Sequence, residues 1–318
     1  MPRTAHHFMI RHVSDTDLER VRAFLEQHAD SSLFLLSTLA ALGPHLGEHP
    51  NSGNYQLVEE AGDVVAVFCL TRRGNLLVQA GGRADLAAAI FAACAAEPVE
   101  LRGVVGEWDT AHALWGLLSA QTSLEPTHYL KDVLYRLRLV ADHDAGVVAH
   151  HADTFTIRAL AERDFVQWER LNSAYHEELH LPLHATREQR QTDYRARVRS
   201  GLWWGAFDDC YELTSIAALN ATYGSLGQVG GVYTRRQDRR RNLARLVLRK
   251  LICDSHARLG FNRLVLFTGE DNLSARGLYE SLGFEAVGAF GLLLGRRDAH
   301  ASAGQRRRGG RKPRAAPT

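Results

Sequence analysis

The chain has 318 residues, enough for one large core or two ordinary ones. Its content of 45% hydrophobic and 23% charged residues is that of a soluble globular protein. The longest apolar run, residues 86–96, is too short to span a bilayer, which argues against a membrane protein. The net charge of +2 is unevenly distributed, because residues 296–318 are strongly basic and the rest of the chain is mildly acidic.

The four cysteines are scattered along the chain and form no C-x-x-C pair. This spacing favours small core residues in a reducing compartment over a disulfide framework or a zinc knuckle. The N-terminus lacks a basic segment followed by an apolar one, so we expect no signal peptide. Together these features predict a cytoplasmic protein.

Two pairs of segments resemble each other. Residues 10–25 (IRHVSDTDLERVRAFL) and 157–172 (IRALAERDFVQWERLN) each predict a short strand ending in Ile-Arg, then an acidic cap and an amphipathic helix. Residues 101–118 and 264–282 each predict a strand, a Gly-Glu pair and a helix. Two long repeats of this kind indicate a tandem domain duplication.

The repeats divide the chain into four parts. We expect a first domain at residues 1–140, a polar linker without periodicity at 141–153 and a second domain at 154–295. The tail, residues 296–318, is basic and almost free of apolar residues, so it cannot bury enough surface to fold.

Helices and strands are interleaved in the second half, which predicts an α/β fold with a mixed sheet flanked by helices. The expected strands end near 158 and cover 203–207, 212–220, 227–234, 263–267 and 284–294. The expected helices cover 162–178, 187–199, 241–259 and 272–282.

A basic run lies between a strand and a helix of this half. Residues 233–250 hold eight Arg or Lys against one Asp. The unpaired N–H groups and the dipole at a helix N-terminus favour phosphate, and arginine forks pair with phosphate oxygens. The run therefore predicts a phosphate-binding loop, with Arg239, Arg240 and Arg241 at the turn.

The segment RRRNLA (residues 239–244) resembles motif A of the GNAT superfamily of acyl-CoA-dependent N-acetyltransferases, and NLSARGLYESLGF (272–284) resembles its motif B. The two occur in the family's order, with a strand between them. The resemblance covers about residues 155–294, and the first half fits the tandem members whose N-terminal copy is degenerate. It implies two GNAT-like domains in tandem, each a twisted mixed sheet flanked by helices.

The resemblance implies that acetyl-CoA is the acetyl donor and that no metal is needed. In the family the strand at 227–234 splays from the strand at 263–267 and pantetheine enters the gap. An N–H near Val232 would then polarise the thioester carbonyl and hold the oxyanion of the tetrahedral intermediate. Asn242 stands where the family has glycine, and Asn is the least costly replacement at positive φ. The implied cofactor-binding residues are Val232, Tyr233, Thr234, Arg239, Arg240, Arg241, Asn242, Leu243, Ala244, Arg245 and Asn272.

Tyr279 in motif B is the implied general acid, which would protonate the leaving CoA thiolate. The alternative is a core aromatic residue. The base that takes a proton from the amine acceptor is not identified by the sequence, and Glu177, Glu178 and Glu212 are candidates.

The first half lacks the arginine loop. Its counterpart segment has Gly81, Gly82 and the single Arg83, and in the register of the repeats Gly116 stands opposite Tyr279. We expect a non-catalytic domain that packs against the second and helps shape the acceptor cleft.

Three other functions are alternatives. The segment HEELH (His176, Glu177, His180) matches a zinc protease pattern, with His184 as a possible third ligand, but Pro182 ends the helix just beyond it. The arginine run and the tail could bind nucleic acid, although the run lacks interleaved aromatic residues. A non-catalytic CoA-binding regulatory protein of the same fold is the closest alternative to an N-acetyltransferase acting on an amine.

Overall fold

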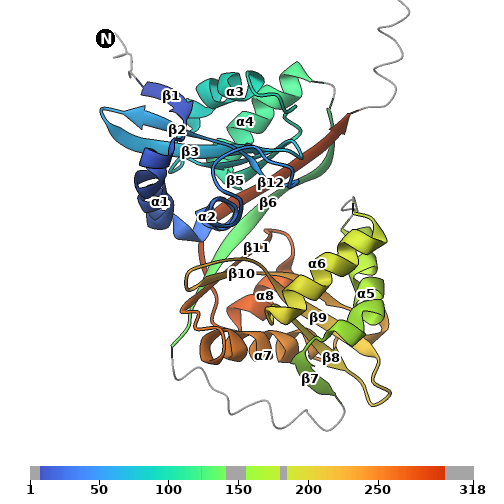
Figure 1. The fold of residues 1–318 in the computed structure, drawn as a ribbon. Coiled ribbons are helices and arrows are strands. Elements are labelled where there is room, and N and C mark those ends of the chain that lie inside the picture. Colours follow the sequence, from blue (N-terminus) through green and yellow to red (C-terminus); the bar gives the residue numbers. More distant parts are fainter. Residues whose placement is uncertain (1–7, 123, 141–154, 180–184, 298–318) are drawn as a thin grey trace, which may run out of the picture.

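The computed structural model describes residues 8–122, 124–140, 155–179 and 185–297 (Figure 1). Its strands are β1 Phe8–His12, β2 Gly53–Glu60, β3 Asp63–Thr71, β4 Asn75–Gln79, β5 Gly103–Glu107, β6 Leu124–Arg138, β7 Thr156–Ala159, β8 Trp203–Phe207, β9 Leu213–Tyr223, β10 Leu226–Thr234, β11 Arg263–Gly269 and β12 Glu285–Arg297. Its helices are α1 Leu18–Gln27, α2 Ala29–Leu42, α3 Ala87–Ala95, α4 Trp108–Gln121, α5 Phe165–Glu178, α6 Arg187–Arg199, α7 Leu243–Ala257 and α8 Leu273–Glu280. Across these ranges no helix is both long and apolar enough to cross a membrane.

The strands form one sheet in the order β1-β2-β3-β4-β5-β12-β6-β11-β10-β9-β8-β7. The pairs β4–β5 and β10–β11 are parallel, and the other neighbours run antiparallel. Each half repeats the sequence strand, two helices, three strands, helix, strand, helix, strand. The mixed α/β fold with two similar halves is confirmed.

The last strand of each half pairs with the sheet of the other half. Strand β6, from the first half, pairs with β11 from Arg138↔Arg263 to Asp132↔Gly269. Strand β12, from the second half, pairs with β5 and also with β6. Figure 1 shows β6 and β12 running together through the middle of the molecule. The linker predicted at 141–153 and most of the tail lie outside the described residues, so the domain boundaries remain a prediction. Strands β6 and β12 each pair with strands on the other side of the expected boundary.

The repeat at the start of each half has a common ion pair. Asp17, just before α1, accepts from both terminal nitrogens of Arg11 at 2.6 and 2.7 Å, which holds the pKa of this carboxyl well below its usual range. Asp164, just before α5, accepts from Arg158 in the same way at 2.7 and 2.9 Å. Each carboxylate also accepts a backbone N–H three residues earlier in the chain and so caps the following turn.

The elements of the second half lie where the sequence predicts them, with differences at their ends. Helix α7 begins at Leu243 and not at Arg241, because Arg240 and Asn242 have φ near +62° and +63°, outside the helical region. Helix α8 ends at Glu280, and Gly283 then turns the chain with φ +89°.

Two apolar layers enclose the sheet of the second half. Helices α7 and α8 pack on one face through residues such as Val247 and Leu251, which are fully buried. Helix α5 packs on the opposite face with Trp168, against Trp203 of β8 and Tyr233 of β10. Strands β10 and β11 therefore separate two helical layers, and anything that enters between them lies between α5 and α8.

Candidate functional site

Strands β10 and β11 pair only at their beginnings. The parallel ladder joins Leu226↔Arg263, Gly227↔Leu264 and Gln228↔Val265. Both strands continue, β10 to Thr234 and β11 to Gly269, without further pairing between them. The backbone groups along both edges of this gap are thus available to an extended ligand, and the gap expected from the family resemblance is present.

A β-bulge bends β10 at the start of the gap. Gly230 pairs with Ala218 and Tyr233 with Ile216, so β10 has one residue more than β9 over this stretch. Gly231 supplies the bend with φ +59°, and a Cβ added there would lie 3.0 Å from Cη2 of Trp203. The bulge therefore depends on a residue without a side chain.

The backbone of β10 alternates between β9 and the gap. Arg235 N–H donates to Thr214 O at 2.9 Å, which places the backbone groups of residues 233 and 235 toward β9. Those of Val232 and Thr234 then point toward the gap, and Thr234 O accepts from Arg239 Nε at 3.2 Å. Of the three residues predicted to bind pantetheine, Val232 and Thr234 offer backbone groups, whereas Tyr233 uses its own in the ladder.

The loop after β10 has the conformation of an anion-binding turn. Asn242 is in the left-handed region with φ +63° and ψ +12° and directly precedes α7. Leu246 N–H donates to Asn242 O at 3.2 Å. The N–H groups of Leu243, Ala244 and Arg245 belong to the first helical turn, which leaves its donors without intrahelical partners. Asn in place of glycine is therefore compatible with the turn.

The arginines of the loop fall into two groups. Arg239 donates to both oxygens of Glu178, at 2.9 and 2.7 Å, and Arg241 donates to Asp238 at 3.0 Å. Arg240 and Arg245 form no ion pair within the described part of the chain. The charges best able to meet a phosphate are thus those of Arg240 and Arg245.

Tyr279 lies on the inner side of α8 and is 8% exposed. Its ring contacts those of Tyr135 and Phe284, with centroids 6.4 and 6.0 Å away. Burial, and to a lesser degree Tyr175 of α5, raises the pKa of its phenol, which therefore keeps its proton at neutral pH. Asn272 caps α8 by accepting from Ala275 N–H at 3.2 Å.

None of the three predicted base candidates is a buried, unpaired carboxylate. Arg239, with Arg236, lowers the pKa of Glu178, so this carboxylate holds protons weakly. Glu177 and Glu212 are exposed. A carboxylate that the sequence analysis did not single out, Asp132 of β6, is instead 5% exposed beside the end of β11. Its signal in the sequence is an acidic residue within a strand of apolar alternation, where Asp is disfavoured.

The corresponding strand pair of the first half is closed. Strands β4 and β5 pair from Asn75↔Gly103 to Val78↔Gly106, almost to their ends. In the following turn Gly82 N–H donates to the carboxylate of Glu107 at 2.7 Å. The donor that would face a phosphate already has an anionic partner.

The repeat register misplaces the counterpart of Tyr279. Gly116 is exposed and a Cβ there would meet nothing within 4 Å, whereas Tyr279 faces the core. The expected pairing of these two positions is wrong, because an offset chosen on the strands need not preserve the inward face of the helix. None of the inward positions of α4 carries a phenol; they are Thr110, Ala111, Leu114, Trp115 and Leu118.

A cavity of about 480 Å³ lies at this edge of the first half. Gly82, Glu107 and His28 line it, together with Arg136 and Arg263, which both bind Asp30 at 3.3 and 2.9 Å. The two arginines of its wall are thus already paired with Asp30.

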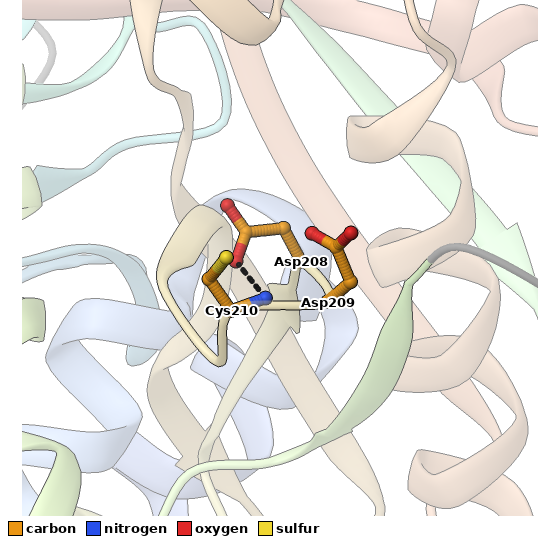
Figure 2. A group of neighbouring side chains, drawn as sticks. All are labelled: Asp208, Asp209 and Cys210. Carbon is orange, nitrogen blue, oxygen red and sulfur yellow. Dashed lines mark hydrogen bonds between the residues drawn. The ribbon is translucent and has the colours of Figure 1, made fainter.

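The zinc pattern is only partly described. His176 is half-buried on α5, and His180 and His184 lie outside the described residues. Over the described ranges the one group of three possible metal ligands within 4.8 Å of one another is Asp208, Asp209 and Cys210 (Figure 2). Asp208 accepts the N–H groups of Cys210 and Glu212 at 3.1 and 2.8 Å, so its side chain stabilises the turn between β8 and β9.

Comparisons with known proteins agree with this geometry. Residues 165–284 match the model of the acetyltransferase (GNAT) family. No curated protein matches the sequence. The fold is similar to that of a GNAT-superfamily N-acetyltransferase from Sphaerobacter thermophilus, with a TM-score of 0.59, 17% identity and coverage of 90% of this chain and 94% of that one.

Two further solved structures cover both halves. A protein from Drosophila has a TM-score of 0.60 and 17% identity, covering 91% of this chain and 99% of that one. A tandem GNAT protein from the clavulanic acid biosynthesis pathway has a TM-score of 0.53 and 15% identity, covering 91% and 98%. At these identities the similarity shows the fold, including its duplication.

Proposed function

Because residues 165–284 form a domain of the acetyltransferase (GNAT) family, we propose that the chain is an N-acetyltransferase that transfers an acetyl group from acetyl-CoA to a primary amine. The observation that carries this proposal is the gap between β10 and β11, which opens beside an anion-binding turn. The scattered free cysteines favour a cytoplasmic setting.

The residues around the gap fit the donor. Val232 and Thr234 present backbone groups along one edge, as an extended chain with amide groups requires. Arg240, Arg245 and the first turn of α7 present cationic groups and N–H donors, as a pyrophosphate requires. Acetyl-CoA, when bound, supplies an activated acetyl thioester.

The backbone and side chains around the gap then have distinct roles. An N–H of β10 near Val232 polarises the thioester carbonyl. Tyr279, whose raised pKa keeps the phenol protonated, gives its proton to the leaving thiolate. The ion pair of Arg239 with Glu178 joins α5 to the loop and holds the wall of the gap in place.

The alternatives considered from the sequence are not favoured by the family match. A non-catalytic CoA-binding protein would share the gap and the loop, so only turnover separates it from an enzyme. A zinc protease would need ligands from residues that the structure does not describe.

Calorimetric titration with acetyl-CoA tests the proposal. We expect saturable binding to the wild type and a loss of about 10-fold or more in affinity in Arg240→Ala/Arg245→Ala, because charge-assisted hydrogen bonds are removed. Arg83→Ala, the matched change in the loop of the first half, should bind as the wild type does. Absence of binding to the wild type, or equal effects of the two loops, would contradict the proposal.

A further inference from the structure

We propose that Asp132, which the first half contributes through the exchanged strand β6, is the general base that deprotonates the amine acceptor in the second half. This inference rests on the proposed function and names the group that completes its proton transfers.

Asp132 is held at the end of the gap by its ladder partners. It pairs with Gly269, the last residue of β11, and with Phe290 of β12. Cross-strand partners share a face, with Cβ atoms about 5 Å apart. Gly269 has no side chain of its own to fill the space beside Asp132. A Cβ at Gly269 would lie 2.8 Å from Oδ1 of Asp271, so a second carboxylate shares this space.

Asp132 differs from the structural aspartates of equal burial. Asp17, Asp164 and Asp132 are 4, 5 and 5% exposed. The first two are neutralised by Arg11 and Arg158, whereas no hydrogen bond or ion pair to the Asp132 carboxylate is found among the residues that the structure describes. A buried carboxylate without a partner is costly, so its presence calls for a ligand or a reaction.

The side chain of Asp132 lies on the face of the sheet opposite helices α7 and α8. On β6 Leu134 faces away from α7 and α8, in a cluster with Phe290, and Asp132 is two residues away on that same face. Tyr175 of α5 contacts the ring of Tyr233 on β10, with centroids 6.1 Å apart. Burial and, after it, the charge of Asp132 raise the pKa of Tyr175. Tyr279 belongs to the α7–α8 layer, so the proposed acid and base lie on opposite faces of the sheet.

The protonation of Asp132 suits the role. Burial, assisted by the charge of Asp271, raises the pKa of Asp132 to about 7. A general base works best when its pKa lies near the operating pH. Other ionisable groups on neighbouring elements include Lys131 and Glu270, which pair at 3.6 Å, Tyr175 on α5, His112 and Asp109 on α4, and Asp30 on α2, which pairs with Arg136 and Arg263.

The protons and bonds balance. Asp132 accepts a proton from the ammonium group, and the freed nitrogen forms the C–N bond to the acetyl carbon. The C–S bond breaks with its electron pair on sulfur, and Tyr279 protonates the thiolate. The second proton lost by nitrogen re-forms the phenol of Tyr279 through solvent, and Asp132 releases its own proton to solvent, so one proton is released for each ammonium ion consumed.

Two small acceptors of similar size test the assignment. Methylamine is an ammonium ion at neutral pH and must lose a proton, whereas hydroxylamine is already neutral. Thiol release from acetyl-CoA is followed with each probe, corrected for the uncatalysed reaction. We expect Asp132→Asn to lower kcat/KM for methylamine at pH 7 by about 100-fold or more, with a much smaller loss for hydroxylamine and unchanged calorimetric affinity for acetyl-CoA.

The pH profile gives a second readout. In the wild type kcat/KM for methylamine should level off above the pKa of Asp132. This inflection should be lost in Asp132→Asn, where kcat/KM only follows the fraction of neutral amine, and should move to lower pH in Asp271→Asn, which removes the neighbouring negative charge. Asp63→Asn, an exposed change at the start of β3, is the matched control and should behave as the wild type does.

The outcomes separate the two proposals. No turnover of either probe by the wild type at any pH would overturn the proposed function, and this inference with it. Wild-type turnover with equal losses for both probes in Asp132→Asn, or with an unchanged inflection, would overturn the assignment of Asp132 alone.

Discussion

Strand pair β4–β5 of the first half and strand pair β10–β11 of the second have the same connection, a parallel ladder with a helix between the strands, but they end differently. The first pair stays joined to Val78↔Gly106, whereas the second separates after Gln228↔Val265. The bulge at Gly231 accompanies the separation. The ladder of β10 with β9 has register shifts at Gln228/Val229 and Gly230/Tyr233, whereas the ladder of β4 with β3 has none.

The turns after β4 and β10 differ in charge as well as in shape. Gly81 and Gly82 have φ of +56° and +76°, and Arg240 and Asn242 have φ of +62° and +63°, so both turns use left-handed residues. In the first half the carboxylate of Glu107 binds the turn, while in the second no ion pair of Arg240 or Arg245 is found among the described residues. A backbone shape shared by the two turns therefore does not by itself make an anion site. The charges of the neighbouring side chains decide whether an anion can bind.

The largest expected effect concerns Tyr279, the phenol that the first half lacks. Tyr279→Phe should lower kcat by about 100- to 10,000-fold, because the leaving thiolate loses its proton donor, and leave acetyl-CoA affinity nearly unchanged. Steady-state kinetics and calorimetry measure the two effects. Tyr55→Phe, a buried phenol of the first half bonded to Leu35 O, should change stability but not turnover. Equal turnover in Tyr279→Phe and the wild type would contradict the role of Tyr279 as the proton donor.

The next effect concerns stability and pH at Asp132. Its pKa of about 7 exceeds the usual 3.8, so the folded protein disfavours the ionised form and loses stability as pH rises from about 4 to about 7. The difference corresponds to about 4 kcal/mol above pH 7. Asp132→Asn should therefore be more stable than the wild type by up to about that amount at pH 8 and nearly equal at pH 4. Urea unfolding at both values measures this, and a difference independent of pH would refute it.

A smaller effect is expected at the bulge. Gly231→Ala should lower the free energy of unfolding by about 1–2 kcal/mol, because alanine is strained at positive φ and its Cβ would lie 3.0 Å from Trp203. It should also weaken acetyl-CoA binding by straightening β10. Gly224 has a similar φ of +53°, and a Cβ added there would meet nothing within 4 Å. Gly224→Ala therefore measures the cost of backbone strain without a steric contact. Equal binding by both variants would mean that the bulge does not hold the gap open.

The smallest effect is expected from exchanging the turn residues of the halves. Asn242→Gly and Gly82→Asn should each change the free energy of unfolding by less than about 1 kcal/mol, because both residues tolerate the left-handed region. Asn242→Val, with a branched side chain, should cost more. Thermal unfolding of the three variants measures the series, and a large loss in Asn242→Gly would show that the hydrogen bond from Arg245 to Asn242 matters more than φ.

The site could be predicted in part. The strand, the turn and the two motifs are local in sequence, so the basic turn with Arg240 and Asn242 could be predicted from the residues. The gap and the role expected of Tyr279 followed from the family resemblance that the motifs carry. The pairing of Arg239 with Glu178 could not, because it joins residues 61 positions apart. The same reason explains why Glu178 looked like a base in the sequence but is neutralised by arginines in the structure.

The sequence by itself determined the elements, the duplication and the basic turn, because periodicity, capping residues and φ preferences act over a few residues. The exchange of β6 and β12, the closure of β4–β5 and the position of Asp132 were decided only by the tertiary structure. Ladder pairing between distant strands depends on the whole sheet, so a residue assigned to one half by the chain can lie in the site of the other. For that reason the second half cannot be understood as a separate domain. Strand β6 of the first half belongs to its sheet and carries Asp132, the base proposed for its reaction.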